Sequence, residues 1–184
     1  YLAKQAYDAS GKPLEGQYIQ PDGSISSTET RYATGKSSLP TSYLGFNTQV
    51  SYKNWDFAIS GHGSFGNYMY NYVAADQYVQ SVYSDQGSYS NILKATQETG
   101  FQTQQLYSDY FLENASFFRI DNISLGYTFH KLWNSSSSLR LTFGVQNVAV
   151  FTGYSGIDPE IYSGIDREVY PRPRTYSFSA SLSF

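Results

Sequence analysis

The segment that most constrains the fold is residues 175–184, where polar and apolar side chains alternate without interruption. Aromatic or apolar residues occupy every even position, and Thr175 and four serines occupy the odd positions. Strict alternation over this length predicts a β-strand with one apolar face and one face of small hydroxyl groups. The hydroxyl face carries no charge, although the water-facing side of a strand in a soluble sheet usually does. Such a strand suits a barrel wall that contacts lipid on one side and a filled or wet interior on the other.

The same segment resembles the closing strand of outer-membrane β-barrels, which typically ends on an aromatic residue. We therefore predict that its apolar side acts as a membrane-insertion signal, carried by Tyr176, Phe178, Leu182 and Phe184. The alternative is an ordinary amphipathic strand in a soluble β-sandwich.

Composition excludes several kinds of membrane segment, binding site and partner. No apolar run approaches the roughly 18 residues of a membrane-spanning helix, so any crossing of a bilayer must use strands. The chain has no cysteine, which removes disulfides and thiolate metal sites, and we predict neither a cofactor nor a bound metal. Its net charge is −3 with scattered basic residues, which argues against a nucleic-acid partner. Because it begins at Tyr1 and holds a single methionine, Met69, we expect it to be a piece of a longer protein.

Further strand periodicity is found in residues 44–52, 55–65, 117–129 and 139–150. Only Lys53 and Asn54 separate the first two of these segments, which predicts a tight hairpin. In the third, the apolar parity slips near Asp121 and Asn122, which predicts a β-bulge.

The connections between these strands alternate in length. Residues 1–43 are interpreted as loop with only short β-like pieces, residues 67–116 as a long functional connection with a short helix at 91–99, and residues 151–174 as a third long loop. The turns at 53–54 and 130–138 are shorter. Because alternate turns of a meander lie on the same side, all long loops emerge at one end, as in outer-membrane barrels.

These features predict an all-β fold, an antiparallel meander of five strands. Charge is sparse within the predicted strands, where we count only Asp56, Arg119, Asp121 and Arg140. Five strands do not close into a barrel, and open edges in lipid would leave backbone groups unpaired. We therefore expect residues 1–184 to be the carboxy-terminal arc of a larger transmembrane barrel.

An ordered set of short motifs runs along the chain. The set comprises LP at 39–40 with Tyr43, GF at 45–46, SYKNWD at 51–56, SFFRI at 116–120, SLGYT at 124–128, QN at 146–147, TGYSGIDPE at 152–160, YPRPRTY at 170–176 and the terminal Phe184. In this order the set resembles the SusC/RagA family of TonB-dependent outer-membrane transporters. It extends over most of residues 13–184, apart from the centre of the long connection. One departure is that the family often carries a more acidic Asp-Gly loop where this chain has residues 20–24, which weakens any ion site there.

The resemblance implies a barrel of roughly 22 strands with a plug in its lumen. It implies a place in the outer membrane of a Gram-negative bacterium, in contact with outer-membrane lipid. It further implies import of oligosaccharides beneath a SusD-like surface lipoprotein, with energy from the TonB complex acting on the plug. A RagA-like importer of oligopeptides is one alternative, and a β-sandwich that only binds its ligand is another. No nucleophile elbow, HExxH or phosphate loop is present, so we do not predict an enzyme.

Candidate residues for contact with substrate or with the lipoprotein lid lie in two of the long connections. The central connection supplies the tyrosines Tyr68, Tyr70, Tyr72, Tyr78 and Tyr83. Their aromatic faces suit either stacking on sugar rings or packing beneath the lipoprotein.

The last connection supplies Tyr154, Asp158, Glu160 and Arg172. The sequence YSGID occurs in it twice, at 154–158 and at 162–166, and its residues favour a duplicated turn. A direct ligand role for Asp158, Glu160 or Asp166 is the alternative. Arg172 is expected to pair with loop carboxylates or, alternatively, with anionic lipid.

Overall fold

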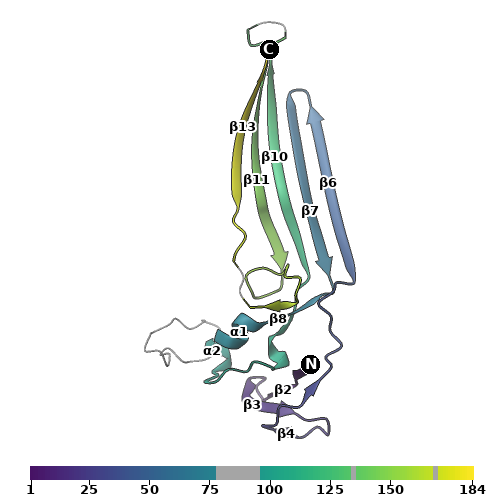
Figure 1. Ribbon diagram of the computed structural model, residues 1–184, viewed down its shortest axis with the longest axis vertical. Helices are drawn as coiled ribbons and strands as arrows, with labels where there is room; N and C mark the ends of the chain where they lie inside the picture. The colour runs from purple at the N-terminus through teal and green to yellow at the C-terminus, as the bar shows by residue number, and fades with distance from the viewer. Residues whose placement is uncertain (78–95, 134–135, 168–169) are drawn as a thin grey trace, which may run out of the picture. The chain divides into compact units, whose positions relative to one another are not determined.

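The computed structural model describes residues 1–77, 96–133, 136–167 and 170–184. The chain divides into two compact units (Figure 1). The sheet unit comprises Pro40–Gly66, Ser116–Gly153 and Tyr170–Phe184. The loop unit comprises Tyr1–Leu39, Asn67–Ala115 and Tyr154–Val169. Each unit is therefore assembled from segments that lie far apart in the sequence.

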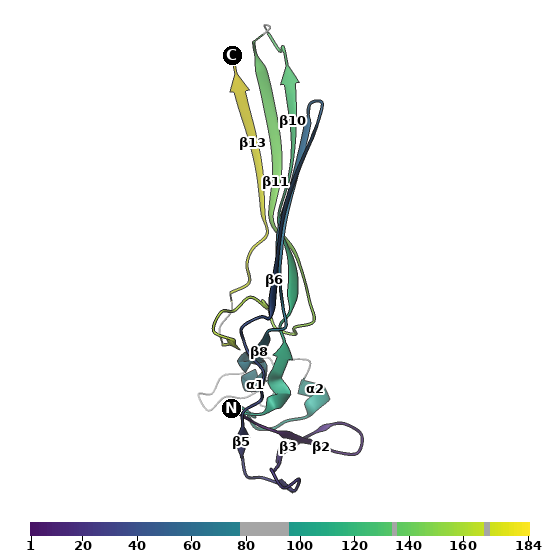
Figure 2. The same ribbon diagram turned by 90° about the vertical axis from the view of Figure 1, so that its right-hand side faces the viewer.

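The sheet unit is one antiparallel sheet of five strands in the order β13-β11-β10-β7-β6 (Figures 1 and 2). Its strands are β6 (Ser42–Tyr52), β7 (Trp55–Phe65), β10 (Phe117–His130), β11 (Ser138–Thr152) and β13 (Thr175–Ser183). All five predicted strands are confirmed. In the part of the chain that the structure describes, neither β6 nor β13 has a second neighbour, so the sheet is open at both edges.

Two local predictions about this sheet are also confirmed. Lys53 and Asn54 form the two-residue turn between β6 and β7, and Lys53 adopts the left-handed conformation with φ 54°. The register of β10 shifts between Ile120 and Asn122 against both of its neighbours. In the pairing with β7, Asp121 is the extra residue, which explains the slip of apolar parity in the sequence. In the pairing with β11, the extra residue lies on β11, where Asn147 and Val148 face Asp121 alone.

One face of the sheet is apolar. Residues directly opposite each other in antiparallel strands lie on the same face. One such row crosses all five strands and consists of Val50, Phe57, Leu125, Phe143 and Phe178, which we call the apolar row. These side chains are between 38% and 70% exposed. The core of a β-sandwich would bury them, so their exposure disfavours the sandwich alternative.

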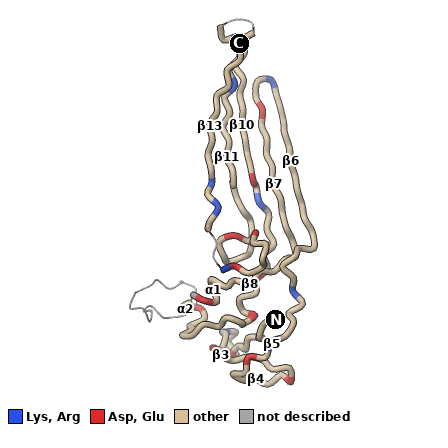
Figure 3. The backbone as a smooth tube through the Cα atoms, in the orientation of Figure 1, with Lys and Arg blue, Asp and Glu red and all other residues tan. Residues whose placement is uncertain are grey.

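The other face of the sheet carries small and polar side chains. A neighbouring row on this face consists of Ser51, Asp56, Gly126, Thr142 and Ser179. The carboxylate of Asp56 lies against Gly126, where an added Cβ would be 2.4 Å from Asp56 Oδ1, and it pairs with Arg140 at 2.7 Å. Charged residues are sparse along these strands (Figure 3). Small side chains with a paired charge are the chemistry expected of a barrel interior.

The predicted insertion signal lies along β13, which pairs with β11 over its whole length from Thr175 to Ser183. Its four apolar members, Tyr176, Phe178, Leu182 and Phe184, are between 45% and 87% exposed. Their exposure is compatible with contact with lipid, and their role in insertion stays a prediction.

The loop unit contains three small sheets, β2-β3-β4, β1-β5 and β12-β8-β9, and short helices. Its elements are β1 (Leu2–Ala3), β2 (Gln5–Tyr7), β3 (Pro13–Ile19), β4 (Ile25–Ser26), β5 (Arg31–Tyr32), β8 (Tyr68–Asn71), α1 (Tyr72–Gln77), α2 (Thr96–Thr99), the 3₁₀ helix η1 (Asp109–Phe111), β9 (Leu112–Asn114) and β12 (Ile165–Asp166). The predicted helix at 91–99 is represented by α2, which stops at Gly100 with φ 70°. Residues 91–95 lie outside the described part of the chain.

The interpretation of residues 1–43 as loop with only short β-like pieces was partly wrong, because β1, β2, β4 and β5 are only two or three residues long but β3 is longer. This segment contributes β1 to β5 and the start of β6, and β3 alone is seven residues long. Its ordering depends on distant partners: Tyr18 is 5% exposed, and its hydroxyl donates a hydrogen bond to Gln105 Oε1 at 3.0 Å. Gln5 is 1% exposed and accepts a hydrogen bond from Ser108 Oγ at 2.6 Å. The turn-forming residues of this segment favour a loop. The hydrogen bonds to residues 105 and 108 stabilise its strands in spite of that local preference.

Two hydrophobic clusters stabilise the loop unit. The first consists of Tyr70, Ala74, Ala75, Phe101 and Phe111, and the second of Met69, Ala115 and Tyr154. Consecutive residues of β8 thus enter different clusters, because successive side chains of a strand point to opposite faces. Among the described residues, no helix combines the length and apolar character needed to span a membrane.

Candidate ligand pocket

A pocket of about 410 Å³ lies within the loop unit. Its aromatic wall is formed by Tyr1, Tyr68, Tyr70, Tyr72 and Tyr107, and we call it the tyrosine pocket. Three of the predicted contact residues, Tyr68, Tyr70 and Tyr72, therefore come together at one site. The other two tyrosines of that prediction, Tyr78 and Tyr83, lie outside the described residues.

β8 positions these tyrosines. It is the middle strand of its sheet, antiparallel to β9 and parallel to β12. Alternation along β8 places Tyr68 and Tyr70 at the pocket, whereas Met69 and Asn71 are 1% and 3% exposed on the other side. Asn71 Oδ1 accepts a hydrogen bond from the backbone N–H of Ala74 at 2.9 Å, and α1 begins at Tyr72 between them. A capping contact therefore fixes the start of the helix that carries the third tyrosine.

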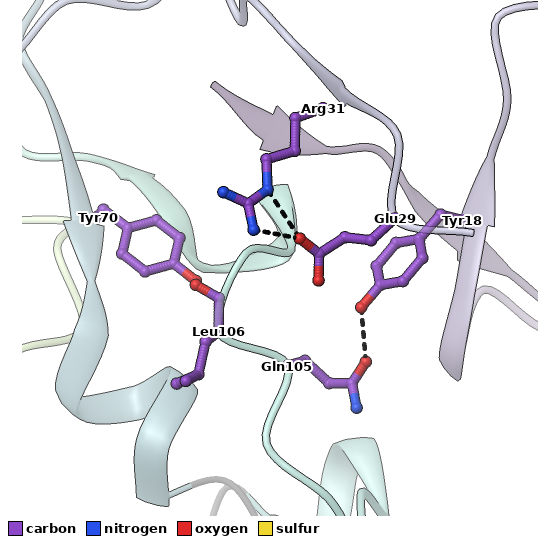
Figure 4. A network of polar contacts seen from close by, with 6 residues as sticks. All are labelled: Tyr18, Glu29, Arg31, Tyr70, Gln105 and Leu106. Carbon is purple, nitrogen blue, oxygen red and sulfur yellow. Dashed lines mark hydrogen bonds and ion pairs between the residues drawn. The ribbon is translucent and has the colours of Figure 1, made fainter. Parts of the chain in front are cut away.

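Tyr70 forms the most enclosed part of the wall. Its hydroxyl donates a hydrogen bond to the carbonyl of Leu106 at 2.7 Å, as its position in Figure 4 illustrates. Burial raises the pKa of Tyr70 above its ordinary value, because the charged phenolate would be poorly solvated. The side chain is thus a neutral aromatic surface and not an acid or base at physiological pH.

Two cations lie over tyrosine rings of the pocket. Lys36 Nζ is 4.3 Å from the ring centroid of Tyr68 and donates a hydrogen bond to its hydroxyl at 3.1 Å. The guanidinium carbon of Arg167 is 5.0 Å from the ring centroid of Tyr72. Both cations line the pocket together with these rings. Cation–π attraction of this kind holds a positive charge in place without cancelling it.

A third cation near the pocket wall is neutralised. The guanidinium carbon of Arg31 lies 3.5 Å from the ring centroid of Tyr107, but Arg31 also pairs with Glu29 at 2.7 Å (Figure 4). This ion pair raises the pKa of Arg31 further above its already high value. Arg31 therefore packs against the back of a pocket tyrosine as part of a neutral pair.

The other predicted contact residues do not line the pocket. Tyr154 is 6% exposed, and its hydroxyl donates a hydrogen bond to Asp166 Oδ2 at 2.7 Å, with burial raising the pKa of both groups. Asp158 is 5% exposed and accepts a hydrogen bond from the backbone N–H of Glu160 at 2.9 Å. The Asp158 contact follows the turn chemistry favoured for the YSGID repeat, whereas the Tyr154 contact joins the two copies of the repeat. A ligand role for Asp158, Glu160 or Asp166 stays a prediction.

Arg172 belongs to the sheet unit, at the approach to β13. Its backbone carbonyl accepts a hydrogen bond from Asn147 Nδ2 at 2.7 Å. Asn147 itself adopts φ 51° in β11, beside the bulge of β10. The structure therefore shows a backbone role for position 172, and the predicted contact of its guanidinium stays a prediction.

We expect Tyr154→Phe to destabilise the loop that carries the repeat by about 1–3 kcal/mol, because it leaves the buried Asp166 carboxylate without its hydroxyl donor. The matched control is Tyr162→Phe, at the equivalent position of the second YSGID copy, where the side chain is 96% exposed. Hydrogen exchange of residues 154–166 in the full-length protein measures the effect. Equal exchange rates in the two variants would contradict a structural role for the Tyr154 hydroxyl.

Sequence reasoning missed the two cations of the pocket and two of its tyrosines, Tyr1 and Tyr107. Lys36, Tyr107 and Arg167 come from three segments that are remote from the tyrosine-rich stretch. Lys36 lies among turn-forming residues, and Arg167 follows the second YSGID copy. No local pattern distinguishes these cations from solvated surface charges, so only the assembled unit reveals them.

Comparisons with known proteins agree with the fold. No protein-family model matches the sequence. The TonB-dependent receptor SusC of Bacteroides thetaiotaomicron is 35% identical over 192 aligned residues, which cover 100% of this chain and 19% of SusC. The TonB-dependent receptor P3 of Formosa agariphila is 26% identical over 132 residues, covering 66% of this chain and 13% of that receptor.

Solved structures of the RagAB peptide transporter share the fold. The 'open-open' state of the RagAB peptide importer matches with a TM-score of 0.72, and another RagAB structure matches with a TM-score of 0.70, both at 23% identity. Each match covers 100% of this chain and 22% of the RagAB chain, so this chain spans about a fifth of the length of its relatives.

The sheet with one apolar and one polar face, together with these matches, defines a wall segment of a TonB-dependent receptor barrel. Within that class, the chain belongs to the SusC/RagA family. Its relatives are receptors and transporters rather than enzymes, in agreement with the interpretation of the sequence.

Proposed function

We propose that the chain forms part of a TonB-dependent transporter of the bacterial outer membrane, which imports oligosaccharides together with a SusD-like surface lipoprotein. The observation that carries this proposal is the 35% identity to SusC along the whole chain. The TonB complex would supply energy through a plug in the complete protein. The chain itself supplies barrel wall and loops.

The chemistry of the sheet supports a place in the membrane. The apolar row is exposed, and the opposite face holds small residues and the ion pair between Asp56 and Arg140. In an outer-membrane barrel the first face meets lipid and the second faces the interior. The open edges of β6 and β13 then pair with further strands of the same barrel, because unpaired edges are not tolerated in lipid.

The tyrosine pocket supports a sugar-like substrate. Its volume of about 410 Å³ falls in the range of small-ligand sites. Tyr68 and Tyr72 line the pocket. Aromatic rings can stack on the C–H faces of a sugar ring, and tyrosine hydroxyls can form hydrogen bonds with sugar hydroxyls. The same groups also suit contact with a lipoprotein lid, which is the other assignment for these tyrosines.

Import of oligopeptides is the second candidate function. It is favoured by the likeness to RagAB, which is described as a peptide transporter. At 23% identity this likeness concerns the fold, and aromatic rings serve peptide side chains as well as sugars.

Deletion of the complete gene separates the two functions. We expect the deletion strain to lose uptake of at least one defined oligosaccharide in a panel of labelled glycan fragments, and to keep uptake of labelled oligopeptides. Reintroduction of the full-length gene is the control and restores uptake. Loss of peptide uptake alone would establish the second candidate, and unchanged uptake of both classes would contradict a transporter role.

A further inference from the structure

We propose that the tyrosine pocket selects an acidic sugar, a residue of an oligosaccharide that carries a carboxylate or a sulfate. This inference rests on the proposed function as an oligosaccharide importer and names the substrate class for that site. It is carried by Lys36 and Arg167, which bring positive charge to a pocket whose wall is otherwise neutral tyrosine, hydroxyl and aliphatic groups.

Lys36 and Arg167 keep their charges within the part of the chain that the structure describes. Across residues 1–77, 96–133, 136–167 and 170–184, neither Lys36 nor Arg167 forms an ion pair, whereas Arg31 and Arg140 each do. The contacts of Lys36 and Arg167 at the pocket are with aromatic rings, at 4.3 Å and 5.0 Å from the ring centroids. A cation in such a contact keeps its charge and its capacity to bind an anion.

Among the described residues, several carboxylates of the loop unit have partners outside the pocket. Glu29 pairs with Arg31, Asp76 accepts from Gln104, Asp109 from Tyr32, Glu113 from Asn71 and Ser155, and Asp166 from Tyr154. Glu113 and Asp166 have their partners on the side of β8 that carries Met69 and Asn71, away from the pocket tyrosines. The described residues that line the pocket therefore include two cations and no carboxylate, a positive charge that an uncharged ligand would leave unused.

An acidic sugar satisfies both features of the site at once. Its ring presents C–H groups to Tyr68 and Tyr72, while the anionic group at the ring edge reaches the ammonium or guanidinium beside the same tyrosines. Hydrogen bonds between ionised groups are shorter and stronger than neutral ones, and a guanidinium can bind a carboxylate or sulfate through two parallel hydrogen bonds. A neutral sugar would gain the stacking contacts alone.

The test is calorimetric binding of trisaccharides to the purified full-length transporter. The panel contains galacturonate, glucuronate, mannuronate and sulfated galactose trisaccharides, each with a neutral counterpart of the same linkage, and an acidic tripeptide. We expect at least one acidic trisaccharide to bind about tenfold tighter than its counterpart, the sum of two partly exposed charge contacts. This preference should shrink at high ionic strength. Carboxylated and sulfated sugars in separate arms show which anion is preferred.

Charge-removing variants assign the preference to the pocket. The double variant Lys36→Gln, Arg167→Gln should reduce the preference to within about twofold, and Lys36→Arg should retain it. Lys53→Gln is the matched control, because Lys53 also lies over a tyrosine ring, 5.3 Å from that of Tyr52, but in the sheet unit. Each variant must show wild-type heat-modifiable migration, which reports a folded barrel.

Several outcomes would overturn the inference. Equal affinity for acidic and neutral sugars, no binding of any acidic sugar, or an acidic preference that survives in the double variant would each refute it. Uptake of neutral oligosaccharides alone would refute it while leaving the transporter proposal intact. Binding of the acidic tripeptide with no sugar binding would refute both, in favour of a peptide importer.

Discussion

Gly61→Ala is expected to destabilise the folded barrel by about 2–3 kcal/mol, because the added methyl group has no space. A Cβ at this position in β7 would lie 2.4 Å from the backbone carbonyl oxygen of Arg119 and 2.5 Å from the ring of Phe46. The carbonyl belongs to β10 beside the bulge, and the Phe46 ring is stacked on Phe118 at 5.6 Å. Neither neighbour can withdraw without separating the strands or breaking the aromatic contact.

Gly45→Ala in β6 is the matched control for this substitution. An added Cβ there meets nothing within 4 Å, so the change is expected to be neutral or slightly stabilising. Urea unfolding of the full-length protein, followed by heat-modifiable migration in gels, measures both variants. Equal unfolding midpoints would contradict the close approach of β7 and β10 at Gly61.

Phe143→Arg tests the proposal that the apolar row faces lipid. Phe143 lies in the middle of that row, between Leu125 and Phe178. A charged side chain on the lipid face of a barrel costs about 2–4 kcal/mol at the bilayer midplane. We therefore expect the full-length variant to assemble poorly in the outer membrane, and to unfold at correspondingly lower urea concentration in vesicles.

Two controls separate the effect of the added charge from the effect of the sheet face on which it lies. Thr142→Arg places the same charge on the next residue of β11, on the polar face, and is expected to cost less than about 1 kcal/mol. Phe143→Leu removes the ring, and with it the contact to Tyr176 at 6.3 Å, while keeping an apolar side chain. If the two arginine variants were equally destabilised, the assignment of the two faces to lipid and lumen would be refuted.

Much of the sheet unit could be predicted because its signals are local. Alternation of side chains has the same period as the strand, so the parity of residues 175–184 was sufficient to predict both β13 and its two faces. The slip at Asp121 predicted the bulge, and Lys53 with Asn54 predicted the turn. A barrel wall consists mainly of strands paired with their neighbours in the chain. The side-chain pattern of each strand and the order of the strands therefore describe most of its structure.

The pocket was only partly predictable. The tyrosines at 68, 70 and 72 were predicted to be contact residues because tyrosine is frequent in this part of the sequence. Alternation along β8 explains why Tyr68 and Tyr70 lie on the same side of the strand. Tyr154 and Asp158 were equally plausible contact residues in the sequence. In the structure both are buried, with Tyr154 hydrogen-bonded to Asp166 and Asp158 to the backbone of Glu160. Polar aromatic residues in a loop look alike in sequence, whether they line a cavity or fill one.

The sequence by itself determined the five strands of the sheet unit, their faces and the family, because each depends on residues close together in the chain or on motifs in order. Only the tertiary structure decided that residues 1–39 fold against residues 96–115, and that Lys36 and Arg167 meet the tyrosines of β8 and α1. The physical reason is that these contacts join segments separated by dozens of residues. Their stability comes from burial and hydrogen bonds that exist only once the segments are assembled.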